Sequence, residues 1–211
     1  MNRVARIIVA TLGSIFGFSG MGHGFFEILQ GDVPTEGVFI SAIGEAQRMW
    51  PHGNEYAVTL IPNFLISGIT AMLVGLALIV WSIGFVHRKN GALILFLLFI
   101  LLLLAGGGVA QILFFPWVYL VSTRINKPLA WWRRVLPARL RMPLGRLWRW
   151  GLVTGSALLV FTLLVAITGF VPTVSDPEAV LATMLVCLAA EVVVLPLTFV
   201  AGFACDLATR P

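Results

Sequence analysis

Four stretches of this sequence are apolar over the length that a helix needs to cross a lipid bilayer. They cover residues 4–29, 58–85, 150–171 and 180–204, and a spanning helix needs about 20 mainly apolar residues. Hydrophobic residues make up 59% of the chain and charged residues only 11%, whereas a soluble domain carries roughly a quarter charged residues. The sequence therefore predicts an all-α, multi-pass helical bundle in the cell membrane, with one transmembrane domain over residues 1–211.

A further apolar stretch, residues 92–121, is too long for a single crossing. As one straight helix it would extend about 45 Å, well beyond the roughly 30 Å hydrocarbon layer. Gly106, Gly107 and Gly108 stand near its middle, and consecutive glycines favour a turn over a helix. We therefore expect four full spans plus a glycine-turned hairpin. Lipid cannot satisfy irregular backbone, so this turn must be buried in protein or line a polar cavity.

The distribution of basic residues also favours the hairpin. With a reversal at the glycines, the amino terminus, the 86–91 connection, the 122–149 segment and Arg210 share one side, and only Arg48 among the Lys and Arg residues lies on the other. Lys and Arg concentrate on the cytoplasmic side of membrane proteins, so both termini are expected in the cytoplasm. A five-span alternative with the amino terminus outside also leaves most basic residues inside, but fewer of them.

Residues 30–57 form the expected outer segment between the first two spans. Acidic residues outnumber the single basic residue here, which is consistent with a position outside the cytoplasm. Apolar residues such as Phe39, Ile43 and Trp50 are interspersed with them. This pattern predicts a short helix or a re-entrant piece that rests on the outer surface.

Small residues at helical spacing predict how the spans pack. Gly13, Gly17, Gly20 and Gly24 fall in one narrow stripe on the first span, because a helix advances by about 100° per residue. In lipid, small residues stabilise helix pairs by letting the two backbones approach closely. We interpret this stripe as a packing face of the bundle and not as a ligand site.

Glu191 is the most informative polar residue because it lies near the middle of the last span. A carboxylate in the membrane is costly unless it is protonated, paired or exposed to a water-filled space, so it marks a candidate functional site. One interpretation is an ion, proton or polar-substrate site, which Gln111 would join if the hairpin tip packs against the last span. The other is a protonated acid that hydrogen-bonds to Gln111 or Asn63 and holds two helices together.

His23 and Glu27 form a second candidate pair at the outer edge of the first span. Their i, i+4 spacing places both on one side of a helix. A metal site with His52 is chemically reasonable for zinc or iron, but two ligands at helical spacing are common by chance and no H-E-x-x-H motif is present. We therefore expect no metal and no cofactor, and interpret the pair as a hydrogen-bonded link to the outer segment.

The 122–149 segment combines basic and aromatic residues, a composition that suits contact with anionic lipids of the cytoplasmic leaflet. The predicted contact residues are Arg124, Lys127, Trp131, Trp132, Arg133 and Arg134. Nucleic-acid binding would use the same residue types. Because the segment joins two membrane spans, a lipid surface is the simpler partner, and no nucleic acid is expected.

Three classes of function follow from these features. The first is translocation of an ion, a proton or a small solute through a mid-membrane site at Glu191. The second is an accessory or structural subunit whose small-residue faces dock other membrane proteins or a second copy of the chain. The third is a membrane enzyme that acts on a lipid-like substrate, with His23 and Glu27 as acid and base.

Overall fold

The computed structural model describes residues 1–209, so Arg210 lies outside the described residues. Four helices are long and apolar enough to cross a membrane, as expected of an all-α membrane protein. The helices are α1 (Arg3–Gln30), α2 (Phe64–Val80), α3 (Gly91–Leu104), α4 (Phe115–Ser122), α5 (Ala130–Val135), α6 (Ala138–Thr168) and α7 (Pro177–Ala208). A π-helical turn (Trp81–Phe85) extends α2, 3-10 turns cover Glu45–Gln47 and Ala110–Leu113, and two short strands are β1 (Phe39–Ser41) and β2 (Tyr56–Val58).

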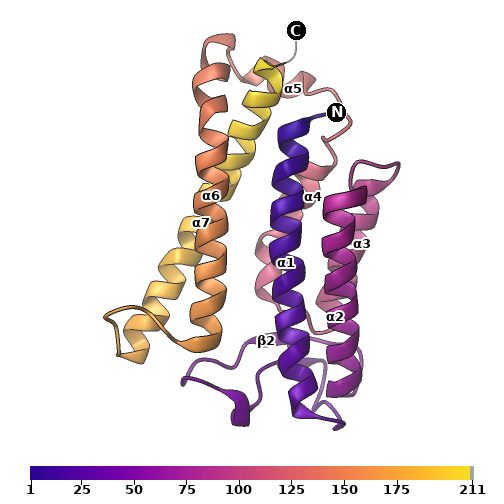
Figure 1. Cartoon of the computed structure of the whole chain (residues 1–211), viewed down its shortest axis with the longest axis vertical. Coiled ribbons are helices and arrows are strands. Elements are labelled where there is room, and N and C mark those ends of the chain that lie inside the picture. Colours follow the sequence, from indigo (N-terminus) through magenta and orange to yellow (C-terminus); the bar gives the residue numbers. More distant parts are fainter. Residues whose placement is uncertain (210–211) are drawn as a thin grey trace.

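The helices form two groups that meet at one end of the molecule (Figure 1). One group contains α1 to α4, and the other contains α6 and α7, which pack along each other. The groups meet at the end that carries the amino terminus, where Gly202 of α7 lies against Ile8 of α1. We call this the terminal end. At the distal end, which carries β1, β2 and the α6–α7 connection, the two groups diverge (Figure 1).

The glycine stripe of α1 is a packing face, as the sequence predicts, and two of its glycines lie against α2. A Cβ atom built on Gly24 would lie 2.5 Å from the Gly68 carbonyl oxygen, and one built on Gly17 would lie 2.7 Å from the Gly75 carbonyl oxygen. Real Cβ atoms do not approach other atoms so closely. Glycine at these positions therefore permits the backbone contact that joins the two helices.

The 92–121 stretch reverses at the predicted glycines. Helix α3 runs toward the distal end, the chain turns at Ala105–Val109, and α4 returns beside α3. Gly106 and Gly108 have φ values of +95° and +92°, a conformation that favours glycine. The turn is buried.

The backbone of this turn is satisfied by the chain that leads into α2. The Leu60 amide donates to the Leu104 carbonyl (2.9 Å), the Gly106 amide to Val58 (2.9 Å), and the Val109 amide to Tyr56 (3.1 Å). The irregular backbone is therefore enclosed by protein, which is one of the two solutions that a membrane permits.

The structure corrects three sequence-based expectations. The 30–57 segment is not a helix but an antiparallel β1–β2 pair with a single 3-10 turn. Helix α2 begins at Phe64 and not near residue 58, because the preceding residues are extended to pair with the glycine turn. Helix α6 begins at Ala138 and continues through Pro143. Pro143 lies in the second helical turn, where its missing N–H removes only one intrahelical hydrogen bond.

Long-range hydrogen bonds hold the terminal end together. The Asp206 carboxylate of α7 accepts from the Val4 amide (3.1 Å) and the Ala5 amide (3.0 Å) at the start of α1. The Asn2 side chain donates to the Arg124 carbonyl and to the Lys127 carbonyl. The first turn of α1 is therefore capped by residues from distant parts of the chain.

Candidate functional site

Polar side chains from both helical groups contribute to the mainly apolar lining of one cavity of about 100 Å³. The cavity lies between α1, the hairpin tip, and helices α6 and α7. Its polar lining comprises Ser19 of α1, His23 of α1, Glu55 before β2, Gln111 of the hairpin, Thr162 of α6 and Glu191 of α7. The structure thus brings Glu191 and Gln111 to one cavity and adds His23 to them.

Glu191 is fully buried near the middle of α7. One carboxyl oxygen, Oε1, accepts a hydrogen bond of 2.9 Å from the Thr162 hydroxyl. Its other oxygen, Oε2, is buried and has no hydrogen-bond partner within residues 1–209. An unpaired buried carboxyl oxygen is costly, so Glu191 has unused capacity to bind a proton, a water molecule or a ligand.

Gln111 is held in place by the hairpin tip. Its side-chain amide donates to the Gly107 carbonyl and, at 3.5 Å, to the Phe16 carbonyl of α1. These two bonds join the glycine turn to α1. Gln111 therefore helps to fix the cavity wall that the hairpin forms.

His23 and Glu55 lie at the distal side of the cavity. His23 Nε2 is 3.6 Å from Glu55 Oε2, and His23 Nδ1 is buried without a partner among the described side chains. The imidazole packs directly on Gly108, where a Cβ atom would lie 2.5 Å from Nε2. Burial raises the pKa of the Glu55 carboxyl group above its ordinary value.

Glu27 does not line the cavity. Its carboxyl group is fully buried and contacts the backbone of Gly106, beside the Ser67 side chain. Neither carboxyl oxygen accepts a hydrogen bond of regular geometry from the residues that the structure describes. The predicted His23–Glu27 pair is therefore split, because each side chain packs against a different glycine of the turn.

Asn63 and His52 also lie apart from the cavity. Asn63 caps α2 by accepting from the Ile66 amide (3.0 Å) and donates to Asp32 (2.7 Å). His52 Nε2 lies 2.9 Å from Oε1 of Glu178, at the start of α7. The metal site considered for His23, Glu27 and His52 is thus not assembled, and no group of three or more metal-ligating side chains occurs among residues 1–209.

A larger apolar cleft of about 390 Å³ adjoins the cavity between α1 and α6. Ser19, His23, Glu55 and Leu163 line both spaces. Most of the remaining lining is aliphatic or aromatic. The cavity at Glu191 therefore adjoins a larger cleft that runs along the surface of the helices.

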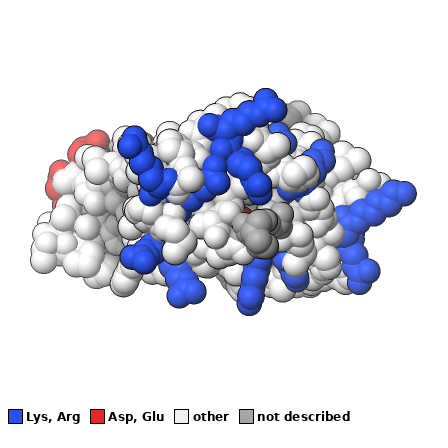
Figure 2. Space-filling view, turned by 90° about the horizontal axis from the view of Figure 1, so that it is seen from above, with Lys and Arg blue, Asp and Glu red and all other residues white. Residues whose placement is uncertain are grey.

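The basic segment lies at the terminal end, where Lys and Arg side chains gather (Figure 2). Of the six predicted lipid-contact residues, Arg124, Lys127, Trp131, Arg133 and Arg134 are exposed. Trp132 is half-buried because its ring packs against Phe203 of α7, with a centroid distance of 4.9 Å. Exposed basic side chains beside Trp131 fit a headgroup-facing surface.

Two cavity residues escape prediction from the sequence. Nothing in the sequence distinguishes Thr162 from the other threonines of its span. Glu55 appears only as one of several acidic residues in the 30–57 segment. Both become significant when α6 and the end of that segment fold against α1.

No known protein-family model matches this chain, and neither curated proteins nor solved structures show detectable similarity to it. The function must therefore be argued from the geometry of the cavity.

Proposed function

We propose that this chain is an integral protein of the cell membrane that translocates protons, alone or together with a small solute, through the cavity at Glu191. The observation that carries the proposal is the buried Glu191 carboxyl group, which has one oxygen without a hydrogen-bond partner among residues 1–209 and lines a cavity together with His23, Glu55 and Gln111. Ionisable residues inside a membrane bundle are expensive and by default serve function.

The cavity has room for water molecules beside its few polar side chains. A volume of about 100 Å³ holds several waters, since one occupies roughly 30 Å³ of liquid. Such waters would bridge Glu191 to His23 and Glu55 on the distal side of the cavity. His23 Nε2 and Glu55 Oε2 are themselves 3.6 Å apart. Imidazole and carboxyl groups both exchange protons readily, so this sequence of groups supports proton movement between the distal end and Glu191.

Charge distribution supports a cytoplasmic terminal end. The 122–149 segment and the 86–91 connection carry the basic side chains of this end, whereas the 30–57 segment at the distal end is acidic. Because Lys and Arg favour the cytoplasmic side, we place both termini in the cytoplasm. The exposed basic and tryptophan side chains there would contact anionic lipids.

The hairpin would occupy the bilayer without crossing it twice in full. Helix α3 has 14 residues and is therefore about 21 Å long at 1.5 Å per residue, short of the roughly 30 Å hydrocarbon layer. In this arrangement the glycine turn lies below the outer surface, enclosed by residues 56–60. The chain then has four full spans plus the hairpin.

The alternative of a membrane enzyme with His23 and Glu27 as acid and base is less well supported. Glu27 contacts Gly106 and does not line the cavity, so it has no path to a substrate beside His23. The alternative of an accessory subunit finds no specific observation in its favour.

The test is proton flux in proteoliposomes under a fixed potassium diffusion potential, followed with a trapped pH-sensitive dye. We expect the Glu191→Gln variant to lower flux at least tenfold, because glutamine keeps the shape but cannot carry a proton. Glu178→Gln is the matched control, since Glu178 is exposed at the start of α7 and should retain full flux. Equal flux in wild type and Glu191→Gln would overturn the proposal.

A further inference from the structure

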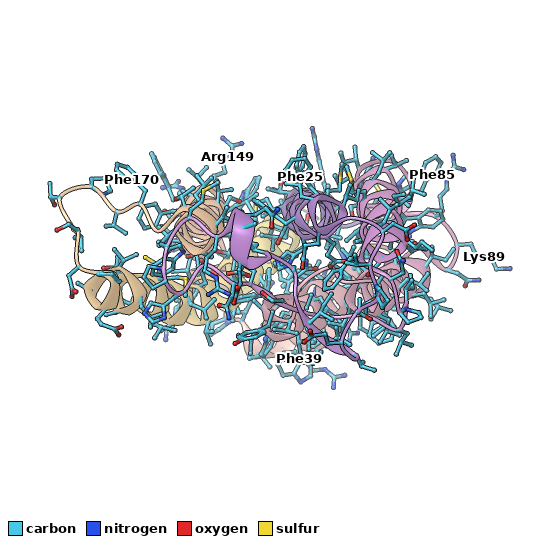
Figure 3. All side chains as sticks on the ribbon, turned by 90° about the horizontal axis from the view of Figure 1, so that it is seen from below. Phe25, Phe39, Phe85, Lys89, Arg149 and Phe170 are labelled. Carbon is cyan, nitrogen blue, oxygen red and sulfur yellow. The ribbon has the colours of Figure 1, made fainter. Side chains whose placement is uncertain are left out.

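The cleft between α1 and α6 opens on the side of the molecule that would face lipid. Phe18 of α1 and Leu164 of α6 line it and are 68% and 55% exposed. Seen from the distal end, α1 and α6 lie along the same side, marked by Phe25 and Arg149, and the 30–57 segment passes beneath them (Figure 3). A molecule dissolved in the bilayer can therefore reach this cleft sideways.

The size and lining of the cleft fit a lipophilic molecule. Its volume of about 390 Å³ falls within the roughly 300–1,000 Å³ of small-molecule sites. Phe18 and Phe26 line it together with aliphatic side chains. Such a surface binds apolar groups, and its aromatic faces attract cations.

The charged groups of the site are acidic. Among the described residues, His23 and Glu55 are the ionisable side chains that line the cleft, and the inner cavity adds only Glu191. No described Lys or Arg side chain lines either space. His23, 3.6 Å away, is the one described basic side chain of this lining beside the largely buried Glu55 carboxylate. Burial of a carboxylate costs free energy, and a bound cation would reduce that cost.

We propose that the α1–α6 cleft binds a lipophilic monovalent organic cation, with its apolar groups in the cleft and its charge against Glu55. The inference rests on the proposed function and names the class of small solute that the site would take. Glu55 lines both the cleft and the inner cavity, so a cation bound to Glu55 would adjoin the cavity that Glu191 also lines.

Tetraphenylphosphonium is a suitable probe because tetraphenylborate has nearly the same shape and the opposite charge. Binding is measured by titration calorimetry on the purified full chain in detergent at pH 8, with protein-free micelles as the blank. We expect tetraphenylphosphonium to bind at least tenfold more tightly than tetraphenylborate. Glu55→Gln should weaken cation binding at least tenfold.

A second variant tests the place of binding independently of charge. A Cβ atom on Gly22, which lines the cleft, meets nothing within 4 Å among the described residues, so Gly22→Leu should fold and fill the cleft. Gly84→Leu is the matched control, because Gly84 is equally open but lies in the π-helical turn after α2. We expect Gly22→Leu to abolish cation binding and Gly84→Leu to leave it unchanged.

The outcomes separate this inference from the proposed function. Equal binding of the two probes, or undiminished cation binding by either Glu55→Gln or Gly22→Leu, overturns the inference. The proton-flux assay contains no organic cation. Flux that depends on Glu191 without any cation binding therefore overturns only the inference, whereas cation binding without such flux overturns only the proton proposal.

Discussion

Replacement of Asp206 by alanine should weaken the junction between the two helical groups. The Asp206 carboxylate belongs to α7, yet it accepts hydrogen bonds from the Val4 and Ala5 amides at the start of α1. Asp206 is only 3% exposed, so water cannot readily replace it. The first amides of a helix have no intrahelical acceptor, and the negative charge also favours the helix N-terminus.

The size of the effect follows from the two lost acceptors. Each buried amide left without a partner costs about 1–3 kcal/mol, and loss of the charge at the helix end adds about 0.3–1 kcal/mol. Partial rearrangement lowers the sum, so we expect Asp206→Ala to reduce the free energy of unfolding by about 2–4 kcal/mol. At roughly 2–4 °C per kcal/mol for a chain of this size, Tm should fall by roughly 4–16 °C.

The assay is thermal unfolding in detergent, followed by tryptophan fluorescence. Asp176→Ala is the matched control, because Asp176 caps α7 through one hydrogen bond to the Ala179 amide (3.1 Å) and is exposed. That variant should lose only about 0.5–1 kcal/mol, and Asp206→Asn should fall between the two. If Asp206→Ala and Asp176→Ala melt at the same temperature, the carboxylate does not join the groups as argued.

Three further perturbations test the packing and the distal end. Gly24→Leu should prevent stable folding, since its Cβ would lie 2.5 Å from the Gly68 carbonyl oxygen, whereas Gly22→Leu on the same helix should elute as wild type in size-exclusion chromatography. Trp50→Phe removes a 2.9 Å hydrogen bond from the indole to a carbonyl of α6 and should lower stability by about 1 kcal/mol, seen as a lower Tm. Burial raises the pKa of Glu55, so its stabilising contribution is present below the ordinary carboxyl pKa and disappears as pH rises through the raised pKa. Over that pH interval the Tm of wild type should therefore fall relative to the Tm of Glu55→Gln. A constant difference in Tm between the two proteins would contradict the assignment.

The reversal at Gly106–Gly108 and the packing face of α1 were predictable from the sequence because both depend on local properties. Three adjacent glycines interrupt an apolar stretch that is too long for one crossing. Small residues at helical spacing identify the packing face of α1, whichever helix packs against it. The bounds of α1 and α7 followed similarly from the apolar runs. The start of α2 did not, since the preceding residues pair with the turn, and α6 begins earlier than its apolar run, at Ala138.

The roles of Glu191, Gln111 and His23 stay predictions, but the sequence singled them out because polar groups inside apolar spans are rare and costly. Their partners could not be read in the same way. Thr162 meets Glu191 only because α6 packs on α7, and Glu55 reaches His23 only because the chain before β2 folds under α1.

Amino-acid order alone determined which segments are apolar enough for a membrane, where the middle stretch turns, and which face of α1 packs closely. These features depend on residues within a few helical turns of one another. Tertiary structure alone decided that β2 encloses the glycine turn, that Asp206 caps α1 from the far end of the chain, and that acids from separate segments meet at one cavity. These contacts join residues that are distant in the chain. Their energies depend on how deeply the assembled helices bury them, which no local sequence pattern specifies.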